Sequence, residues 1–167
     1  WLRKYAEQIG SFSVFDGNTP NHVLVNEYEP GQGIMPHEDG PLFYPVVSTI
    51  NLGSHSVLNF YRHIDRIVAE TPENKDTSTD GLGDSLNNRH SMSLLLEPRS
   101  LLLLTGDLYK SYLHGIDTIT QDILDDFITN IDFCRAKLGE TLTRSKRVSL
   151  TIRYVPKVIK AKFKFGK

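Results

Sequence analysis

The stretch that decides the fold is Asn26-Glu27-Tyr28-Glu29-Pro30-Gly31-Gln32-Gly33-Ile34-Met35-Pro36-His37-Glu38-Asp39-Gly40. It sets an imidazole and a carboxylate two residues apart after a glycine-rich turn. Because residues i and i+2 of a strand share a face, we expect His37 and Asp39 to point the same way and Glu38 to the opposite side. His114 is the candidate for a third ligand. Two imidazoles and one carboxylate leave an ion's other positions open, as in non-haem Fe(II) oxygenases, although a His-x-Asp pair also arises by chance.

A second informative stretch is Arg147-Val148-Ser149-Leu150-Thr151-Ile152-Arg153-Tyr154-Val155, which alternates polar and apolar residues and predicts a half-buried strand. Arg147, Ser149, Thr151 and Arg153 share one face of that strand. Two guanidinium groups on one face suit a dicarboxylate, because each planar fork can hold a carboxylate with two parallel hydrogen bonds. The alternative is an edge strand whose basic face lies in solvent.

Taken in order along the chain, these motifs resemble those of a known family. Asn26-x-Tyr28, His37-x-Asp39, His114 and Arg147-x-Ser149-x-x-x-Arg153 together resemble the motif set of the AlkB family of Fe(II)- and 2-oxoglutarate-dependent dioxygenases. The resemblance covers the chain from Asn21 to Lys167, apart from two insertions at 62–91 and 117–146. It implies an all-β core, a double-stranded β-helix or jelly roll, with one or two flanking helices.

The resemblance also implies a chemistry and a role for each motif. His37, Asp39 and His114 would bind Fe(II), with 2-oxoglutarate and O2 as co-substrates. Arg147 would pair with the distal carboxylate of 2-oxoglutarate and Tyr28 would donate to it, while Arg153 and Asn26 support the chelating end and Ser149 completes the arginine motif. The reaction would be oxidative demethylation of N-alkylated nucleic-acid bases, which releases succinate, CO2 and formaldehyde.

Departures from the family pattern make iron and co-substrate binding a firmer expectation than any nucleic-acid substrate. Ser149 stands where many members carry Asn, and Pro41 where some demethylases carry an acid. The chain starts at Trp1, so we expect the N-terminal lid region of the family to be missing. Phe43 and Tyr44 are candidates for stacking on a flipped base, against the alternative of simple packing. Two other functions stay open: the same chemistry on a protein or small molecule, and a catalytically weak nucleic-acid-binding scaffold.

Length and composition predict one domain spanning residues 1–167. The net charge of −1 gives no whole-molecule reason to expect nucleic acid, so binding of a DNA or RNA substrate would need a local patch. Cys134 is the single cysteine, which excludes an internal disulfide and fits the cytoplasm and nucleus. No apolar run or signal-peptide pattern indicates a membrane, and we expect a monomer.

Local patterns predict the remaining elements. A helix is expected over Trp1–Gly10 and another inside the second insertion, where apolar residues recur at helical spacing between a cap at Thr120 and a stop at Gly139. The first insertion is predicted to be a mobile surface segment. The alternating lysines of 157–167 predict a terminal strand whose charges prevent pairing with other strands, and the alternative is that these lysines contact a phosphate backbone. Tight hairpins are expected at 53–55, with His55 exposed, and at 98–99. Strands are expected at 22–28, 46–52, 56–61, 92–97, 100–104 and 147–155.

Overall fold

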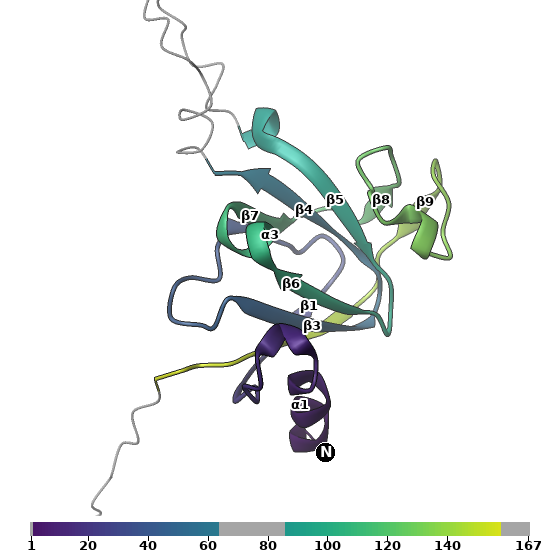
Figure 1. Ribbon diagram of the computed structural model, residues 1–167. Helices are drawn as coiled ribbons and strands as arrows, with labels where there is room; N and C mark the ends of the chain where they lie inside the picture. The colour runs from purple at the N-terminus through teal and green to yellow at the C-terminus, as the bar shows by residue number, and fades with distance from the viewer. Residues whose placement is uncertain (1, 64–85, 158–167) are drawn as a thin grey trace, which may run out of the picture.

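The computed structural model describes residues 2–63 and 86–157, which form two four-stranded antiparallel sheets packed face to face (Figure 1). The strands are β1 (His22–Tyr28), β2 (Ile34–His37), β3 (Val46–Gly53), β4 (Ser56–Arg62), β5 (His90–Leu96), β6 (Leu101–Thr105), β7 (Tyr112–Ile116) and β10 (Arg147–Arg153). One sheet has the order β1-β10-β3-β6 and the other β2-β7-β4-β5. With helices α1 (Leu2–Gly10) and α3 (Gly106–Lys110), this arrangement confirms the predicted jelly roll.

Strands of the sandwich that follow one another in the chain lie in opposite sheets, with the exception of β4 and β5, which are neighbours in one sheet. β3 pairs with β10 and β6, whereas β4 pairs with β5 and β7, so the turn at 53–55 carries the chain across the sandwich. The predicted hairpins at 53–55 and 98–99 are therefore wrong, because apolar strands of this kind do not specify which neighbour they pair with. Gly53 is required in the crossing, since its φ is +76° and a Cβ there would lie 2.4 Å from the Lys146 carbonyl oxygen.

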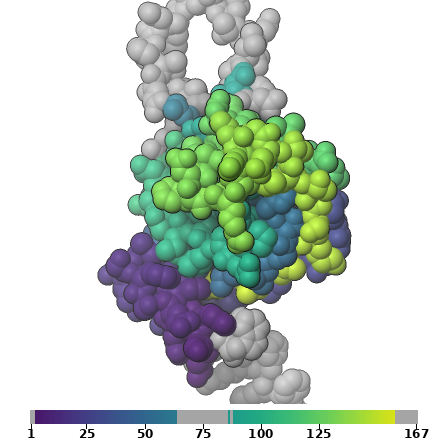
Figure 2. All heavy atoms as spheres, turned by 90° about the vertical axis from the view of Figure 1, so that its right-hand side faces the viewer, coloured from purple at the N-terminus to yellow at the C-terminus, as the bar shows by residue number. Residues whose placement is uncertain are grey.

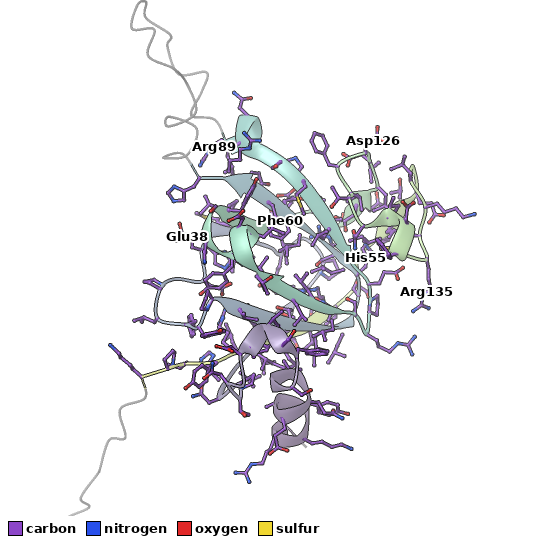
Figure 3. All side chains as sticks on the ribbon, viewed as in Figure 1. Glu38, His55, Phe60, Arg89, Asp126 and Arg135 are labelled. Atoms are coloured by element: carbon purple, nitrogen blue, oxygen red, sulfur yellow. The ribbon has the colours of Figure 1, made fainter. Side chains whose placement is uncertain are left out.

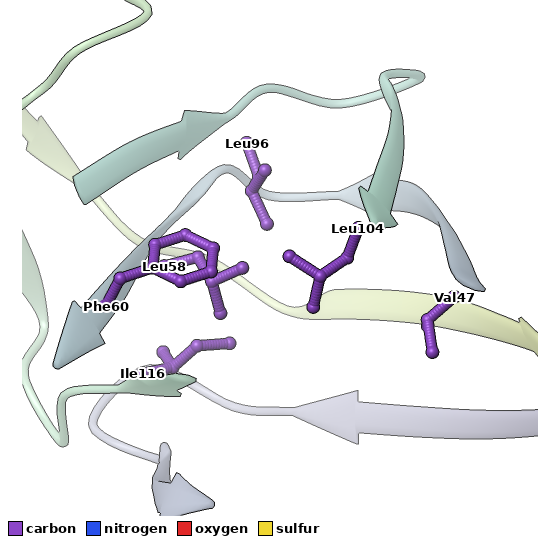
Figure 4. Close-up of a cluster of buried hydrophobic side chains, with 6 residues drawn as sticks. All are labelled: Val47, Leu58, Phe60, Leu96, Leu104 and Ile116. Carbon is purple, nitrogen blue, oxygen red and sulfur yellow. The ribbon is translucent and has the colours of Figure 1, made fainter. Parts of the chain in front are cut away.

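The main core fills the space between the two sheets, and alternate residues of β4 supply its centre. Leu58 and Phe60 point inward, while Val57 and Tyr61 point to the outer face of the sheet. Figure 4 shows the inward cluster, in which Phe60 is fully buried. Its buried members are Val47, Leu58, Phe60, Leu96, Leu104 and Ile116.

The predicted N-terminal helix is confirmed as α1, which covers the outer face of the β1-β10-β3-β6 sheet (Figure 1). Ile9 from α1 packs against Phe15, Val46 and Ile152, all of which are buried. Phe15 lies in the short 3₁₀ turn η1 (Ser13–Phe15) that follows. The cluster fixes β3 and β10 from behind, on the side away from the main core.

The predicted helix between Thr120 and Gly139 is wrong. The segment holds β8 (Gln121–Ile123), the 3₁₀ turn η3 (Ile131–Phe133) and β9 (Thr141–Thr143), and Figure 2 shows it spread across one face of the molecule. Leu124 and Ile128 are buried against β4 and β5, so the apolar spacing marks burial and not a helix. Asn130 bonds to both backbone groups of Leu95, at 2.8 and 2.9 Å, and the Phe127 carbonyl and Thr129 amide pair with the backbone of Ser93, so these groups are not free for a helix.

Several expectations fall on residues outside the described ranges. They are the character of the first insertion over 64–85 and the lysine-rich tail over 158–167. From residue 86 on, that insertion forms the 3₁₀ turn η2 (Leu86–Arg89) and then enters β5 at His90. Among the described helices, none has the length and apolar character that a membrane crossing needs.

Candidate functional site

A cavity of about 620 Å³, its open mouth included, lies between the sheets and is lined by most of the residues singled out in the sequence. Antiparallel pairing sets Asn26 directly opposite Ser149 and Tyr28 directly opposite Arg147. Residues opposite each other on neighbouring strands share a face, so two motifs far apart in the chain form one wall. The polar lining residues are Asn26, Tyr28, His37, Asp39, Thr49, His114, Arg147, Ser149, Thr151 and Arg153.

The two candidate histidines are brought together by strand pairing. His37 of β2 lies opposite His114 of β7, and their ring centroids are 4.5 Å apart. The His37 Nδ1 atom is 2.8 Å from the Met35 carbonyl oxygen, which leaves Nε2 as the nitrogen available for a ligand. Gly33 makes the close approach of the strands feasible, since a Cβ there would lie 2.1 Å from the Ile116 carbonyl oxygen.

Asp39 lies beside the two histidines but not on a strand. His37 and Asp39 both line the cavity, as expected, but β2 ends at His37, so Asp39 reaches the cavity from the loop after β2 and not from the strand itself. Glu38 does point elsewhere, since its carboxylate lies 3.0 Å from the His63 imidazole and does not line the cavity.

The Asp39 carboxylate is 2% exposed, and its two oxygens have different surroundings. Oδ1 is hydrogen-bonded and ion-paired with the Arg153 guanidinium, whereas Oδ2 is buried without a hydrogen-bond partner and lies 3.7 Å from His114 Nε2. Burial, opposed by the Asp39 charge, lowers the pKa of His114 to about 4, so its imidazole is neutral as metal binding requires.

These donors fit a divalent cation. A buried carboxylate oxygen without a partner beside a neutral imidazole is an unusual arrangement unless something else completes it. Among the described residues, no three His, Cys, Asp or Glu side chains are close enough to hold an ion as they stand. An ion would therefore have to draw Asp39, His37 and His114 together.

Arg147 forms the far end of the cavity. β10 lies between β1 and β3, and Arg147 and Arg153 are 5% and 8% exposed, so the alternative of a solvated edge strand is wrong. Burial is the main reason that the pKa of Arg147 is lowered, and it likewise raises the pKa of the Tyr28 hydroxyl against the pull of the Arg147 charge. Tyr28 therefore keeps its proton at neutral pH and can donate it in a hydrogen bond.

The sequence interpretation missed Asn51, which orients Arg147. Asn51 is fully buried, and its Oδ1 accepts a hydrogen bond of 2.5 Å from an Arg147 terminal nitrogen. It lies opposite Ser149 on β3, two residues after the cavity-lining Thr49. The sequence signal for Asn51 was its position two residues after Thr49, because alternate residues of a strand lie on the same face. The Nε atoms of Arg147 and Arg153 are buried without partners, which leaves donors available for an anionic ligand.

Neither Phe43 nor Tyr44 lines the cavity. The Phe43 ring lies 4.7 Å from the Arg153 guanidinium carbon, in a cation–π arrangement beside the site. The Tyr44 ring packs with the cluster of Val46 and Ile152 and makes an edge contact with Tyr154. The structure thus places Phe43 next to a site residue and Tyr44 in the packing between sheet and helix.

A second polar cluster joins the 117–146 segment to the sandwich. Arg144 holds the Asp122 carboxylate with two hydrogen bonds of 2.7 and 2.6 Å, and His55 Nε2 lies 3.1 Å from the same carboxylate. Both members of the ion pair are buried. The expectation that His55 is exposed is therefore wrong, because Asp122 covers it. Figure 3 shows His55 and Glu38 toward opposite ends of the sandwich, with Phe60 between them.

Comparisons with known proteins agree with this geometry. The family model of the 2OG-Fe(II) oxygenase superfamily matches residues 1–153. The chain is 48% identical over 167 residues to "Probable RNA/DNA demethylase ALKBH6" of Danio rerio, which covers all of this chain and 67% of that protein. It is 27% identical over 160 residues to "Uncharacterized protein L905" of Acanthamoeba polyphaga mimivirus, covering 93% of this chain and 60% of that one.

A third relative extends the similarity to plants. The chain is 28% identical over 154 residues to "Alkylated DNA repair protein ALKBH8 homolog" of Arabidopsis thaliana, which covers 89% of this chain and 39% of that protein. The chain thus spans about two fifths to two thirds of the length of these relatives. The family match and the extended similarity to the Danio rerio protein show that the chain belongs to the 2OG-Fe(II) oxygenase superfamily, among its AlkB-like members.

Proposed function

We propose that the protein is an Fe(II)- and 2-oxoglutarate-dependent dioxygenase in which His37, Asp39 and His114 hold the iron. The observation that carries the proposal is the buried Asp39 Oδ2, which has no hydrogen-bond partner and faces His114 Nε2 at 3.7 Å. A carboxylate and two neutral imidazoles form the donor set of a facial Fe(II) site. Arg153 pairs with the other oxygen of this carboxylate, Oδ1, and so leaves Oδ2 for the ion.

The co-substrate site is proposed on the wall formed by β1, β10 and β3. Arg147 would hold the distal carboxylate of 2-oxoglutarate, with Asn51 orienting the guanidinium and Tyr28 donating its hydroxyl proton. Asn26, Ser149 and Arg153 would support the chelating end nearer the iron ligands. The apolar residues of the cavity, Leu58, Leu104 and Ile116 among them, exclude water from this end of the sandwich.

For the primary substrate we propose an N-alkylated nucleic-acid base. Two relatives are named as a probable RNA/DNA demethylase and an alkylated DNA repair protein, and this chain shares their family. Fe(II) held by the proposed ligands, with 2-oxoglutarate and O2, would supply the oxidant that hydroxylates an N-methyl carbon, which would then leave the nitrogen as formaldehyde. Phe43, whose ring lies against the Arg153 guanidinium, is a side chain beside the site that would be suited to contact a base.

The test is formaldehyde and succinate release across a panel of methylated DNA and RNA oligonucleotides. Asp39→Asn should abolish both products and weaken Fe(II) binding, because one anionic ligand is lost. Glu38→Gln is the matched control, since it makes the same change one residue away on a side chain that does not line the cavity.

The outcome of the assay separates the remaining functions. Succinate release with a peptide or small molecule, but with no oligonucleotide, would assign the same chemistry to another substrate. Oligonucleotide binding without turnover would favour a scaffold. Unchanged turnover in Asp39→Asn would refute the proposed ligand set.

A further inference from the structure

A second cleft of about 900 Å³, its open mouth included, lies on the outer face of the β2-β7-β4-β5 sheet. Alternate residues of β4 form its floor, so the sheet itself separates it from the co-substrate cavity on the other face. The segment from Asp117 to Ile128 forms its other wall, and neither the proposed chemistry nor the iron ligands involve it. The lining residues are Val57, Asn59, Tyr61, His90, Ser93, Asp117, Ile119, Asp122, Ile123, Asp125, Phe127 and Ile128.

The floor of this acidic cleft, as we name it, carries a directed chain of hydrogen bonds. Ser93 Oγ donates to Asn59 Oδ1 at 2.7 Å, and Asn59 Nδ2 donates to Asp117 Oδ2 at 2.9 Å. Because the Ser93 proton is used in this way, His90 Nε2, 2.9 Å from Ser93 Oγ, is the donor of that contact. Ser93 and Asn59 are buried, so the chain fixes the position of the Asp117 carboxylate at the edge of the cleft.

One wall of the acidic cleft is aromatic. The His90 ring centroid lies 5.3 Å from that of Tyr61 and 4.7 Å from that of Phe127. Phe127 is 47% exposed, so about half of this ring is open to a ligand in the cleft. The three rings form a continuous surface from the floor to the mouth, and flat cations are attracted to aromatic faces.

The charge of the acidic cleft has one sign. Its described lining contains three aspartates and no lysine or arginine. Arg144 and His55 already hold the Asp122 carboxylate, and Arg144 also donates to the Asp117 carbonyl oxygen at 2.7 Å, so the carboxylates of Asp117 and Asp125 are the lining acceptors left for a ligand. After burial, the charge of Asp117 is the next cause that raises the pKa of Tyr61. A phosphate backbone would be repelled here, so the cleft is not an extension of a nucleic-acid surface.

From these observations we infer that the acidic cleft binds a guanidinium group, as carried by an arginine side chain. A guanidinium is planar and stacks on aromatic rings, and its forked donors match carboxylate acceptors, whereas an ammonium offers neither property. Phe127 and His90 would supply the stacking surface, and Asp117 and Asp125 the acceptors. The inference does not depend on iron or on turnover.

The experiment titrates the full chain with N-acetyl-L-arginine methylamide and follows binding by NMR chemical shifts and calorimetry. The citrulline analogue has nearly the same shape without the charge and should not bind, and the lysine analogue should bind several-fold more weakly. Free arginine and an arginine-containing peptide form two further arms. A peptide that binds more tightly than free arginine would identify the source as a protein segment, and the reverse would identify the free amino acid.

Adjacent aspartates provide the matched variants. Asp125 lines the acidic cleft and Asp126 does not, although both are exposed. Asp125→Asn should weaken binding about tenfold, as expected for a charged hydrogen bond, while Asp126→Asn should change it less than about twofold. Phe127→Ala removes a half-exposed ring and should weaken binding about threefold or more.

Three results would overturn the inference: equal binding of the citrulline analogue, equal loss in Asp125→Asn and Asp126→Asn, or no shift of cleft resonances at millimolar arginine analogue. Thermal unfolding of each variant shows whether it is folded. Because the readout is binding, a failure of the dioxygenase assay would leave this test unaffected.

Discussion

Replacing Asp122 by asparagine removes the charged partner of a buried guanidinium. Arg144 is 7% exposed and Asp122 2%, and the carboxylate accepts three contacts, two from Arg144 and one from His55. Breaking a buried ion pair from one side costs about 3–5 kcal/mol, because the remaining charge stays desolvated. The carboxamide keeps one acceptor, so we expect a loss of about 3 kcal/mol in the free energy of unfolding.

Urea unfolding followed by circular dichroism measures this loss. With a denaturant slope of about 2 kcal/mol per molar, the midpoint should fall by about 1.5 M. Arg135→Gln is the control, because Arg135 is 76% exposed and lies 3.9 Å from Glu97, a geometry typical of pairs that contribute less than about 1 kcal/mol. The double variant Asp122→Leu with Arg144→Met should be more stable than Asp122→Asn, since no buried charge remains unpaired.

The same comparison has a defined pH dependence. Burial alone would raise the pKa of Asp122, but the hydrogen bonds and charges of Arg144 and His55 outweigh it and hold the pKa below the ordinary value of 3.8. The stabilisation is therefore complete above pH 3.8 and is lost as the pH falls further toward the lower folded-state pKa. A loss below about 1 kcal/mol at neutral pH, or a difference between wild type and Asp122→Asn that grows on acidification, would refute the reasoning.

Three further changes test the site and its support. Arg147→Gln should raise the KM for 2-oxoglutarate about 10- to 100-fold with a smaller change in kcat, measured by succinate release, because one or two charged hydrogen bonds are lost. Gly33→Ala forces β2 away from β7 and should lower both the unfolding temperature and the Fe(II) affinity, measured by calorimetry, since His37 and His114 move apart. Phe60→Ala empties the centre of the core and should cost about 3–5 kcal/mol in urea unfolding.

The parts of the site that the sequence could predict are those fixed by local pattern. Alternation along 147–153 correctly places Arg147 and Arg153 on one face, and pairing with β1 then brings Tyr28 opposite Arg147. Asn51 could not be singled out by residue type, because an asparagine inside an apolar strand gives no indication of which side chain it will meet across the sheet. Asp39 reaches the cavity from a loop, where the strand argument does not apply.

The strand order in the sheets and the conformation of the second insertion could not be predicted from local patterns, for a different reason. The residues of 53–55 do not distinguish a hairpin from a crossing between sheets, because a short polar turn can make either connection. Around Leu124 and Ile128 the helical spacing was genuine, but burial against β4 and β5 and the backbone contacts of Asn130 determined the conformation. Tertiary contacts override weak local preference in segments of this length.

The pairing of β1 with β10 has a consequence for how the protein is made. Tyr28 leaves the ribosome more than a hundred residues before Arg147, and the two meet only when the last strand slides in between β1 and β3. Until β10 is made, β1 therefore has no neighbouring strand in the β1-β10-β3-β6 sheet, and assembly that depends on such distant partners is slow. A chain whose synthesis stops before Arg147 would contain His37, Asp39 and His114 but would lack the strand that supplies Arg147 and Arg153.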